Sequence, residues 1–147
     1  STERIAGFEA LLRWCHPARG WISPEKFITI AEESGLIAQI GEWALRQACQ
    51  DLSRWPEDVR VAVNVSPLQF ANPHLPAMVT SAIAQAGIAA SRLELEITES
   101  VFLSDDEGTD AMFAALKRIG VRLALDDFGT GYSSLGYLKK APFDKIK

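Results

Sequence analysis

Aliphatic residues occupy every second position in three short stretches of the chain, with polar or small residues between them. The three stretches are Arg60–Val65, Leu93–Thr98 and 121–127. Successive side chains of a strand point to opposite faces, so this pattern predicts strands with one aliphatic face and one polar face. Two further strands are predicted at 7–12, where Gly7 and Glu9 share a face, and at 143–147.

Between these strands, apolar residues recur with helical spacing. Ser23 and Pro24 predict the start of a helix that ends near Gly35, and His16 to Gly20 are predicted as loop. The other predicted helices run from Ile37 to before Pro56, over Leu75–Ala86, from a capping-box pattern at Ser104 to Ile119, and over 133–139. Strands that alternate with helices predict a parallel sheet and an α/β fold.

The polar faces of the predicted strands define the architecture further. The later strands recur at about the 30-residue spacing of a βαβ unit, and each polar face ends in a polar group at the carboxyl end of its strand. Barrels and open sheets of the α/β class place their functional sites at that end. We therefore infer a TIM-type (β/α) barrel. Because a complete barrel needs about 250 residues, the 147 residues predict a truncated part of one.

Five polar residues share the carboxyl ends of the predicted strands. They are Glu9, Asn64, Glu96, Asp126 and Asp127. Any one of them can be explained as a solvated strand end or a helix cap. Crowded carboxylates repel one another, however, and a divalent cation removes that conflict. Ligands that are all oxygen suit Mg²⁺ or Mn²⁺, and neighbouring Asp126 and Asp127 can serve two ions of the kind that cleave phosphodiesters.

Glu94 and Arg122 lie one layer below these residues on adjacent predicted strands. Their opposite charges and shared face predict a buried structural pair. The histidines, His16 and His74, have no ligand spacing and are expected on the surface. Cys15 and Cys49 have neither metal nor redox spacing, so they are expected to be reduced, half-buried thiols.

Composition limits the classes of function. Hydrophobic residues make up 48% and charged residues 23%, which is typical of a globular protein. The net charge of −4 argues against binding DNA or an anionic membrane through a basic surface. No apolar run approaches the roughly 18 residues of a membrane span. We therefore expect no membrane segment in this chain, and either a cytoplasmic location or a place in the cytoplasmic part of a membrane-anchored parent protein.

Five motifs occur in an order that resembles the EAL domain family. They are EALLRW at 9–14, NVS at 64–66, EITE at 96–99, DDFGTGYSS at 126–134 and KIK at 145–147. A Glu-Ala-Leu triplet alone is common, but the nine-residue stretch and the ordered set are specific. The resemblance implies a modified TIM barrel that opens cyclic di-GMP to linear pGpG with two Mg²⁺ or Mn²⁺ ions.

The resemblance also implies roles for single residues. Glu9, Asn64, Glu96 and Asp126 would be metal ligands, and Asp127 would bridge the ions or bind the second. These five residues correspond to those that the strand pattern singled out. The implied catalytic residues are Glu9, Asp127 and Lys147. Of these, Lys147 would help to position the attacking water.

Substrate contacts and loop contacts follow from the same resemblance. Arg13 and Leu11 would contact the substrate, and the guanidinium of Arg13 suits a phosphate. Glu99 would anchor the loop after the fourth strand, and the loop 129–134 would link the metal site to a dimer contact. The alternatives are a surface cation at Arg13, a helix-start carboxylate at Glu99 and an ordinary connection at 129–134.

We expect residues 1–147 to form a partial EAL domain that lacks the first strand and the C-terminal part of the barrel. The expected partners are cyclic di-GMP, a second copy in a homodimer, and an upstream sensory or GGDEF-type domain. Two further hypotheses remain open. One is a non-catalytic receptor for cyclic di-GMP, and the other is an inert scaffold or dimerisation module. The isolated chain is expected to be inactive.

Overall fold

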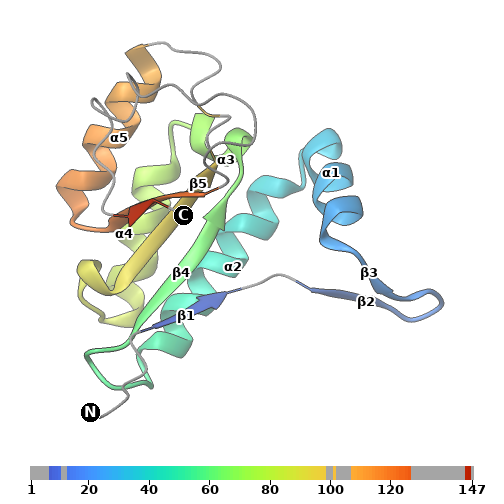
Figure 1. Ribbon diagram of the computed structural model, residues 1–147, viewed down its shortest axis with the longest axis horizontal. Coiled ribbons are helices and arrows are strands. Elements are labelled where there is room, and N and C mark those ends of the chain that lie inside the picture. Colours follow the sequence, from blue (N-terminus) through green and yellow to red (C-terminus); the bar gives the residue numbers. More distant parts are fainter. Residues whose placement is uncertain (1–6, 11–12, 99–100, 102–106, 127–144, 147) are drawn as a thin grey trace.

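The computed structural model describes residues 7–10, 13–98, 101, 107–126 and 145–146. Strands and helices alternate along the chain (Figure 1). The strands are β1 Gly7–Ala10, β2 Trp14–His16, β3 Gly20–Ile22, β4 Arg60–Val65, β5 Leu93–Thr98, β6 Arg122–Asp126 and β7 Lys145–Ile146. The helices are α1 Pro24–Ser34, α2 Ile37–Leu52, α3 Pro67–Ala71, α4 Leu75–Ala86 and α5 Glu107–Ile119, with a 3₁₀ turn, η1, at Ala90–Arg92.

The main sheet has five strands in the order β1-β4-β5-β6-β7. Every neighbouring pair in it is parallel. Parallel neighbours need crossover connections, and α2, α4 and α5 supply them. The predicted α/β fold with a parallel sheet is therefore confirmed. None of the helices in the part of the chain that is described is long and apolar enough to cross a membrane.

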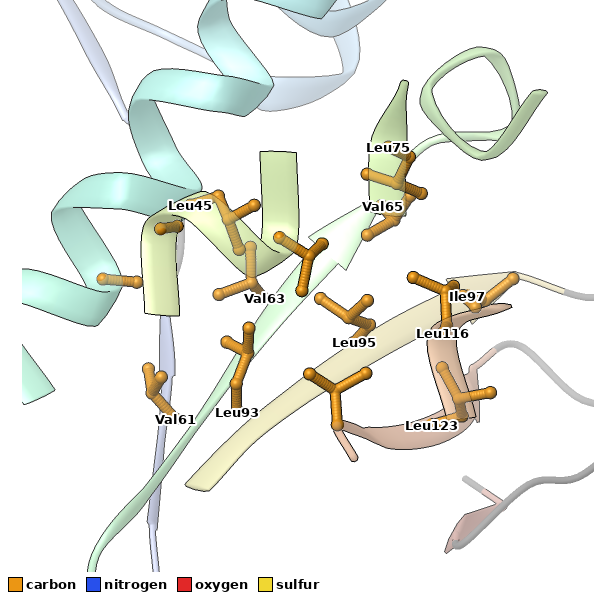
Figure 2. Close-up of a cluster of buried hydrophobic side chains, with 14 of the residues drawn as sticks. Leu45, Val61, Val63, Val65, Leu75, Leu93, Leu95, Ile97, Leu116 and Leu123 are labelled. Atoms are coloured by element: carbon orange, nitrogen blue, oxygen red, sulfur yellow. The ribbon is translucent and has the colours of Figure 1, made fainter. Parts of the chain in front are cut away.

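The hydrophobic core lies on the helix-covered face of the sheet. Leu93, Leu95 and Ile97 of β5 are 0% exposed, and the aliphatic residues of β4 pack beside them (Figure 2). Helices α2 and α4 lie behind these strands in Figure 1 and contribute Leu45 and Leu75 to the same cluster. Full burial of one such side chain contributes roughly 1.5–3 kcal/mol. The alternation seen in the sequence therefore marks the core face correctly.

The ends of the predicted helices agree with the structure at both proline and glycine signals. Pro24 occupies the first turn of α1, and Gly35 ends that helix with φ +82°. Gly87 ends α4 with φ +69°. Glycine adopts this left-handed conformation without the clash that a Cβ would cause. Ser23 stands at the N-cap position of α1, but its side chain makes no capping hydrogen bond.

Two elements differ from the sequence expectations. Residues expected as loop around His16 and Gly20 form an antiparallel hairpin, in which Trp14 pairs with Ile22 and His16 with Gly20. His16 is therefore a strand residue and not a loop residue. The short helix α3 was not predicted, and it begins directly after β4. The predicted short helix at 133–139 lies outside the described residues.

A buried arginine closes the amino-terminal end of the sheet. Arg92 is 9% exposed, and its Nε donates a hydrogen bond to Val59 O at 2.9 Å. Its Nη2 donates to Leu52 O at 3.2 Å, Trp55 O at 3.3 Å and Pro56 O at 2.6 Å. Leu52 is the last residue of α2, so the cation also lies at the negative end of that helix dipole. Arg92 thus ties η1 to the whole α2–β4 connection.

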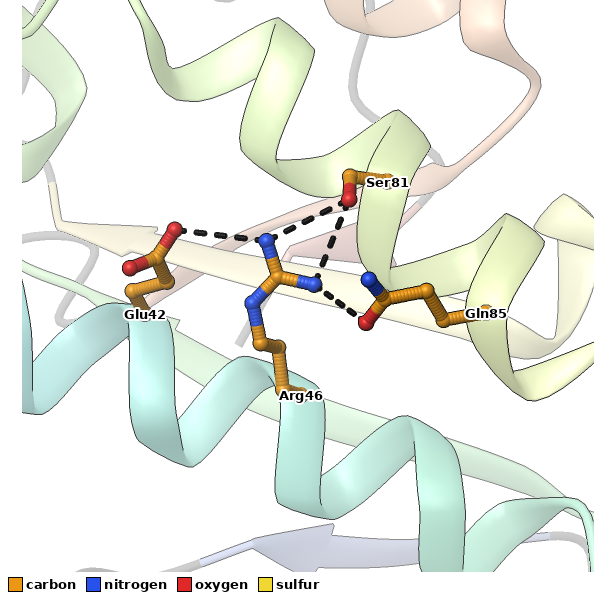
Figure 3. A network of polar contacts seen from close by, with 4 residues as sticks. All are labelled: Glu42, Arg46, Ser81 and Gln85. Atoms are coloured by element: carbon orange, nitrogen blue, oxygen red, sulfur yellow. Dashed lines mark hydrogen bonds and ion pairs between the residues drawn. The ribbon is translucent and has the colours of Figure 1, made fainter.

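A second arginine joins α2 to α4 on the outside (Figure 3). Arg46 Nη1 donates to Gln85 Oε1 at 2.6 Å, and both Nη atoms reach Ser81 Oγ, at 3.3 and 3.2 Å. Arg46 Nη2 also lies 3.3 Å from Glu42 Oε1 one turn earlier on α2. Because these side chains are partly exposed, each contact contributes little alone, but together they fix how the two helices lie side by side.

Candidate functional site

Asn64 and Glu96 are direct neighbours across two parallel strands. Asn64 of β4 is in register with Glu96 of β5. Both lie on the face opposite the aliphatic core, because their strand neighbours Val63 and Leu95 belong to the core cluster. Glu96 is 1% exposed, whereas Asn64 is exposed. The structure therefore brings together an amide and a buried carboxylate near the carboxyl ends of adjacent strands.

The backbone register relates Glu9 and Asp126 to this pair. Glu9 is in register with Ala62, two residues before Asn64 on β4. Asp126 is in register with Thr98, two residues beyond Glu96 on β5. Glu9 thus lies two residues nearer the amino end than the level Asn64–Glu96 pair, and Asp126 lies two residues nearer the carboxyl end. Strands of a barrel tilt, and a level of the barrel shifts by about one residue per strand. The net offset of four residues over three strand pairs is close to that average, although Asn64 and Glu96 themselves are level.

The described donors fit a hard divalent cation. Amide and carboxylate oxygens are the ligands of Mg²⁺ and Mn²⁺, and Asn64 and Glu96 supply one of each. Over the residues that the structure describes, no group of three or more His, Cys, Asp or Glu side chains could hold a metal ion. The side chains of Glu9 and Asp126 lie outside that set, so the five-residue ligand set stays a prediction.

Several predicted site residues lie outside the described part of the chain. They are Leu11, Glu99, Asp127, Lys147 and the loop 129–134. Arg13 is described and exposed, which agrees with a substrate contact and with a surface cation alike. The segment before Lys147 joins the main sheet, since Lys145 of β7 is in register with Ala124 of β6. Residues from the last motif therefore run beside the strand that carries Asp126.

Glu94 and Arg122 form the pair predicted one layer below. They are in register on β5 and β6, and Arg122 Nε lies 4.0 Å from Glu94 Oε1. The side chain of Glu94 is 10% exposed, but that of Arg122 is 31% exposed. The contact is confirmed, although the pair is only partly buried. Its charges are opposite, so the pair adds no net charge beneath the acidic residues at the carboxyl ends of the strands.

The short helix α3 supports the end of β4, and the sequence expectations did not include it. Ser66 caps the helix, because Ser66 Oγ accepts from Gln69 N at 3.2 Å. Gln69 Oε1 accepts from Ser66 N at 3.0 Å, which completes a capping box. A Ser-Pro-x-Gln pattern at 66–69 carries this signal in the sequence. Gln69, four residues beyond the end of β4, is therefore held by a local structure that the sequence encodes.

The cysteine and histidine expectations are corrected in part. Cys49 is 0% exposed, so it is fully buried and not half-buried. Burial raises the pKa of the Cys49 thiol to about 11, and the nearby Arg46 lowers it slightly. A thiol that stays protonated is a poor nucleophile and a poor ligand. His74 is exposed, as expected, and stands at the N-cap position of α4.

Comparison with known proteins identifies the relatives of the chain. The EAL domain family model matches residues 1–147. The chain is 54% identical over 146 residues to the y4lL protein of Sinorhizobium fredii, covering 99% of the chain and 18% of that protein. It is 45% identical over 147 residues to MucR of Pseudomonas aeruginosa, a bifunctional diguanylate cyclase/cyclic di-GMP phosphodiesterase, covering 97% of the chain and 22% of MucR.

A solved structure shows the same fold. The phosphodiesterase PaMucR in complex with c-di-GMP superposes with a TM-score of 0.89 at 44% identity, covering 94% of this chain and 57% of that one. Measured against the curated relatives, this chain spans about a fifth of their length. The parallel sheet and its helices are part of the TIM-type barrel of EAL domains. The family match and these relatives together show that this chain belongs to the EAL domain family.

Proposed function

We propose that the protein to which this chain belongs hydrolyses cyclic di-GMP to linear pGpG with two divalent cations, Mg²⁺ or Mn²⁺. The observation that carries the proposal is the pairing of Asn64 with the buried Glu96 on the face opposite the core. The staggered register of Glu9 and Asp126 supports it. MucR, which is 45% identical, is named as a bifunctional diguanylate cyclase/cyclic di-GMP phosphodiesterase.

The proposed ligands are Glu9, Asn64, Glu96, Asp126 and Asp127. When bound, the cations would lower the pKa of a water molecule and stabilise charge on the attacking and leaving oxygens. Glu96 suits its part because a carboxylate that is 1% exposed is screened from competing solvent. Asn64 contributes a neutral oxygen, which limits the repulsion among the acids.

Other residues would bind and orient the substrate. Arg13 is proposed to bind a phosphate of cyclic di-GMP, because its planar guanidinium matches two phosphate oxygens. Leu11 is proposed to contact the substrate, and Lys147 to hold the attacking water. Glu99 is proposed to anchor the loop that follows the fourth predicted strand. Proximity and orientation of this kind supply a large part of the rate in hydrolytic enzymes.

The test is release of pGpG from cyclic di-GMP by the full-length protein, followed by chromatography with Mg²⁺, with Mn²⁺ and with EDTA. We expect hydrolysis with either ion and none with EDTA. Glu9→Ala and Asp127→Ala should each abolish turnover. Glu57→Ala is the matched control, because Glu57 is exposed in the connection before β4, at the opposite end of that strand. It should leave the rate unchanged.

Two results would contradict the proposal. Full activity of Glu9→Ala would show that the ligand assignment is wrong. Binding of cyclic di-GMP by calorimetry without any pGpG release would instead identify a receptor.

A homodimer and an upstream sensory or GGDEF-type domain are proposed as well. The second rests on MucR, which combines a diguanylate cyclase with a phosphodiesterase. Light scattering of the full-length protein tests the dimer, and a monomer at micromolar concentration would refute it.

A further inference from the structure

The amide of Gln69, a residue of α3, lies against α2 just beyond the carboxyl end of β4. Gln69 is 9% exposed, and its Oε1 accepts from Ser66 N at 3.0 Å. Its Nε2 lies against Gly41 of α2. A Cβ on Gly41 would overlap Gln69 Nε2 and come within 2.5 Å of Gln69 Cδ. With Gln69 in this conformation, a Cβ at position 41 would therefore force the amide to move.

The segment that Gln69 holds is the one that follows Asn64. Ser66 is the first residue after β4, and its N–H is fixed by Gln69. Pro67 comes next and restricts its own φ angle. Farther along α3, the ring of Phe70 packs on that of Phe113 of α5 at 4.9 Å between centroids. The backbone beyond Asn64 is thus anchored to both α2 and α5.

We propose that Gln69, seated on Gly41, is a positioning residue that fixes the carboxyl end of β4 and thereby aims Asn64 at the divalent cations. The proposal rests on the function proposed above. On one side Asn64 is set by its register with Glu96, and on the other by the capping box. Residues that orient a ligand commonly change metal affinity by 10–100-fold when they are replaced.

The experiment measures Mn²⁺ binding by the full-length protein without substrate, from the electron paramagnetic resonance signal of free Mn²⁺. Gln69→Ala and Gly41→Ala should each raise the half-saturating Mn²⁺ concentration by about tenfold. Gln69→Glu keeps an acceptor for Ser66 N–H and should stay within about twofold, because capping boxes accept Glu or Gln at this position. At saturating Mn²⁺, the KM for cyclic di-GMP should not change.

A double-mutant cycle separates this mechanism from a general loss of stability. In the wild-type background, Gly41→Ala displaces the Gln69 side chain, so it should lower Tm. In the Gln69→Ala background the space is free, and the same change should raise Tm, since alanine is the better helix former. The two substitutions should also fail to add in Mn²⁺ affinity, because both release the same amide. If Gln69→Ala does not fold, Gln69→Leu replaces it in the affinity measurement.

The proposal is overturned if the Gln69 variant lowers Tm but binds Mn²⁺ within twofold of wild type. It also falls if Asn64→Ala binds Mn²⁺ as the wild type does, because Gln69 acts through Asn64. Failure of the proposed function looks different: the wild-type protein would then show no Mn²⁺-dependent release of pGpG at all.

Discussion

Replacing Arg92 with methionine should destabilise the domain by about 3 kcal/mol, through loss of a donor to buried carbonyls. Methionine has a similar length and fills the same space, so little cavity is created. What disappears is a cation that donates to four backbone oxygens at the amino-terminal end of the sheet. The change is also far along the strands from Asn64 and Glu96, so the effect on stability is separable from any effect on the site.

The magnitude follows from what each carbonyl retains. Leu52 O and Pro56 O also accept backbone hydrogen bonds, from Trp55 N at 3.1 Å and Val59 N at 3.0 Å, so they keep a donor after the substitution. Val59 O and Trp55 O each lose a hydrogen bond to a charged donor, which contributes about 1.5–3 kcal/mol where the groups are shielded from water. Loss of the cation at the end of α2 adds about 0.3–1 kcal/mol. The gain from burying an apolar side chain offsets part of this cost.

Urea unfolding of the complete domain measures the effect. With a slope of about 1–3 kcal/mol/M, the midpoint should fall by roughly 1–3 M while the slope stays constant. Arg54→Met is the matched control, because Arg54 is exposed in the same connection, and it should leave the midpoint unchanged. A midpoint for Arg92→Met equal to that of Arg54→Met would refute the reasoning.

Three more predictions concern ionisable groups. Cys49 should resist iodoacetamide at pH 8 until the protein unfolds, because burial raises the pKa of its thiol from 9.0 to about 11. Modification of Cys49 by iodoacetamide in the folded protein would contradict this. By linkage, the stability from its burial should be complete below pH 9 and should be lost as the pH rises toward 11, since the unfolded thiol ionises first. Glu94 Oε1 and Arg122 Nε lie 4.0 Å apart, and the side chain of Arg122 is 31% exposed. A double-mutant cycle with Glu94→Gln and Arg122→Met should therefore give a coupling free energy of about 0.5–1 kcal/mol. A coupling of zero would show that the contact contributes nothing to stability.

Strand bounds were predictable where one face of the strand is apolar and the alternation stops clearly at both ends. The predicted bounds of β4 and β5 agree with the structure at both ends, because each strand has three aliphatic residues on one face. The hairpin of β2 and β3 was missed for the opposite reason. Its strands have three residues each, which is too short for alternation to be recognised, and Gly20, the first residue of β3, has φ +72°.

For the site, the sequence predicts which face of the sheet the polar side chains occupy, but not how far each of them is buried. Alternation placed Asn64 and Glu96 on one side of the sheet, and the register confirms that they are neighbours. It could not predict that Glu96 is 1% exposed while Asn64 is exposed, because that depends on how neighbouring strands and loops cover each position. The contacts of Arg92 were equally out of reach, since they depend on the shape of the α2–β4 turn.

The two faces of the sheet carry separate properties of the protein. Aliphatic side chains beneath the helices supply most of the packing, whereas the polar residues near the strand ends lie on the other side. A change at Asn64 therefore removes no side chain from the apolar cluster. A protein of this design can lose its chemistry and still be purified as a well-folded molecule with an ordinary melting curve. Thermal shift alone is thus a poor screen for inactive variants, and substitutions at the strand ends are well suited to trapping bound ligand in an intact fold.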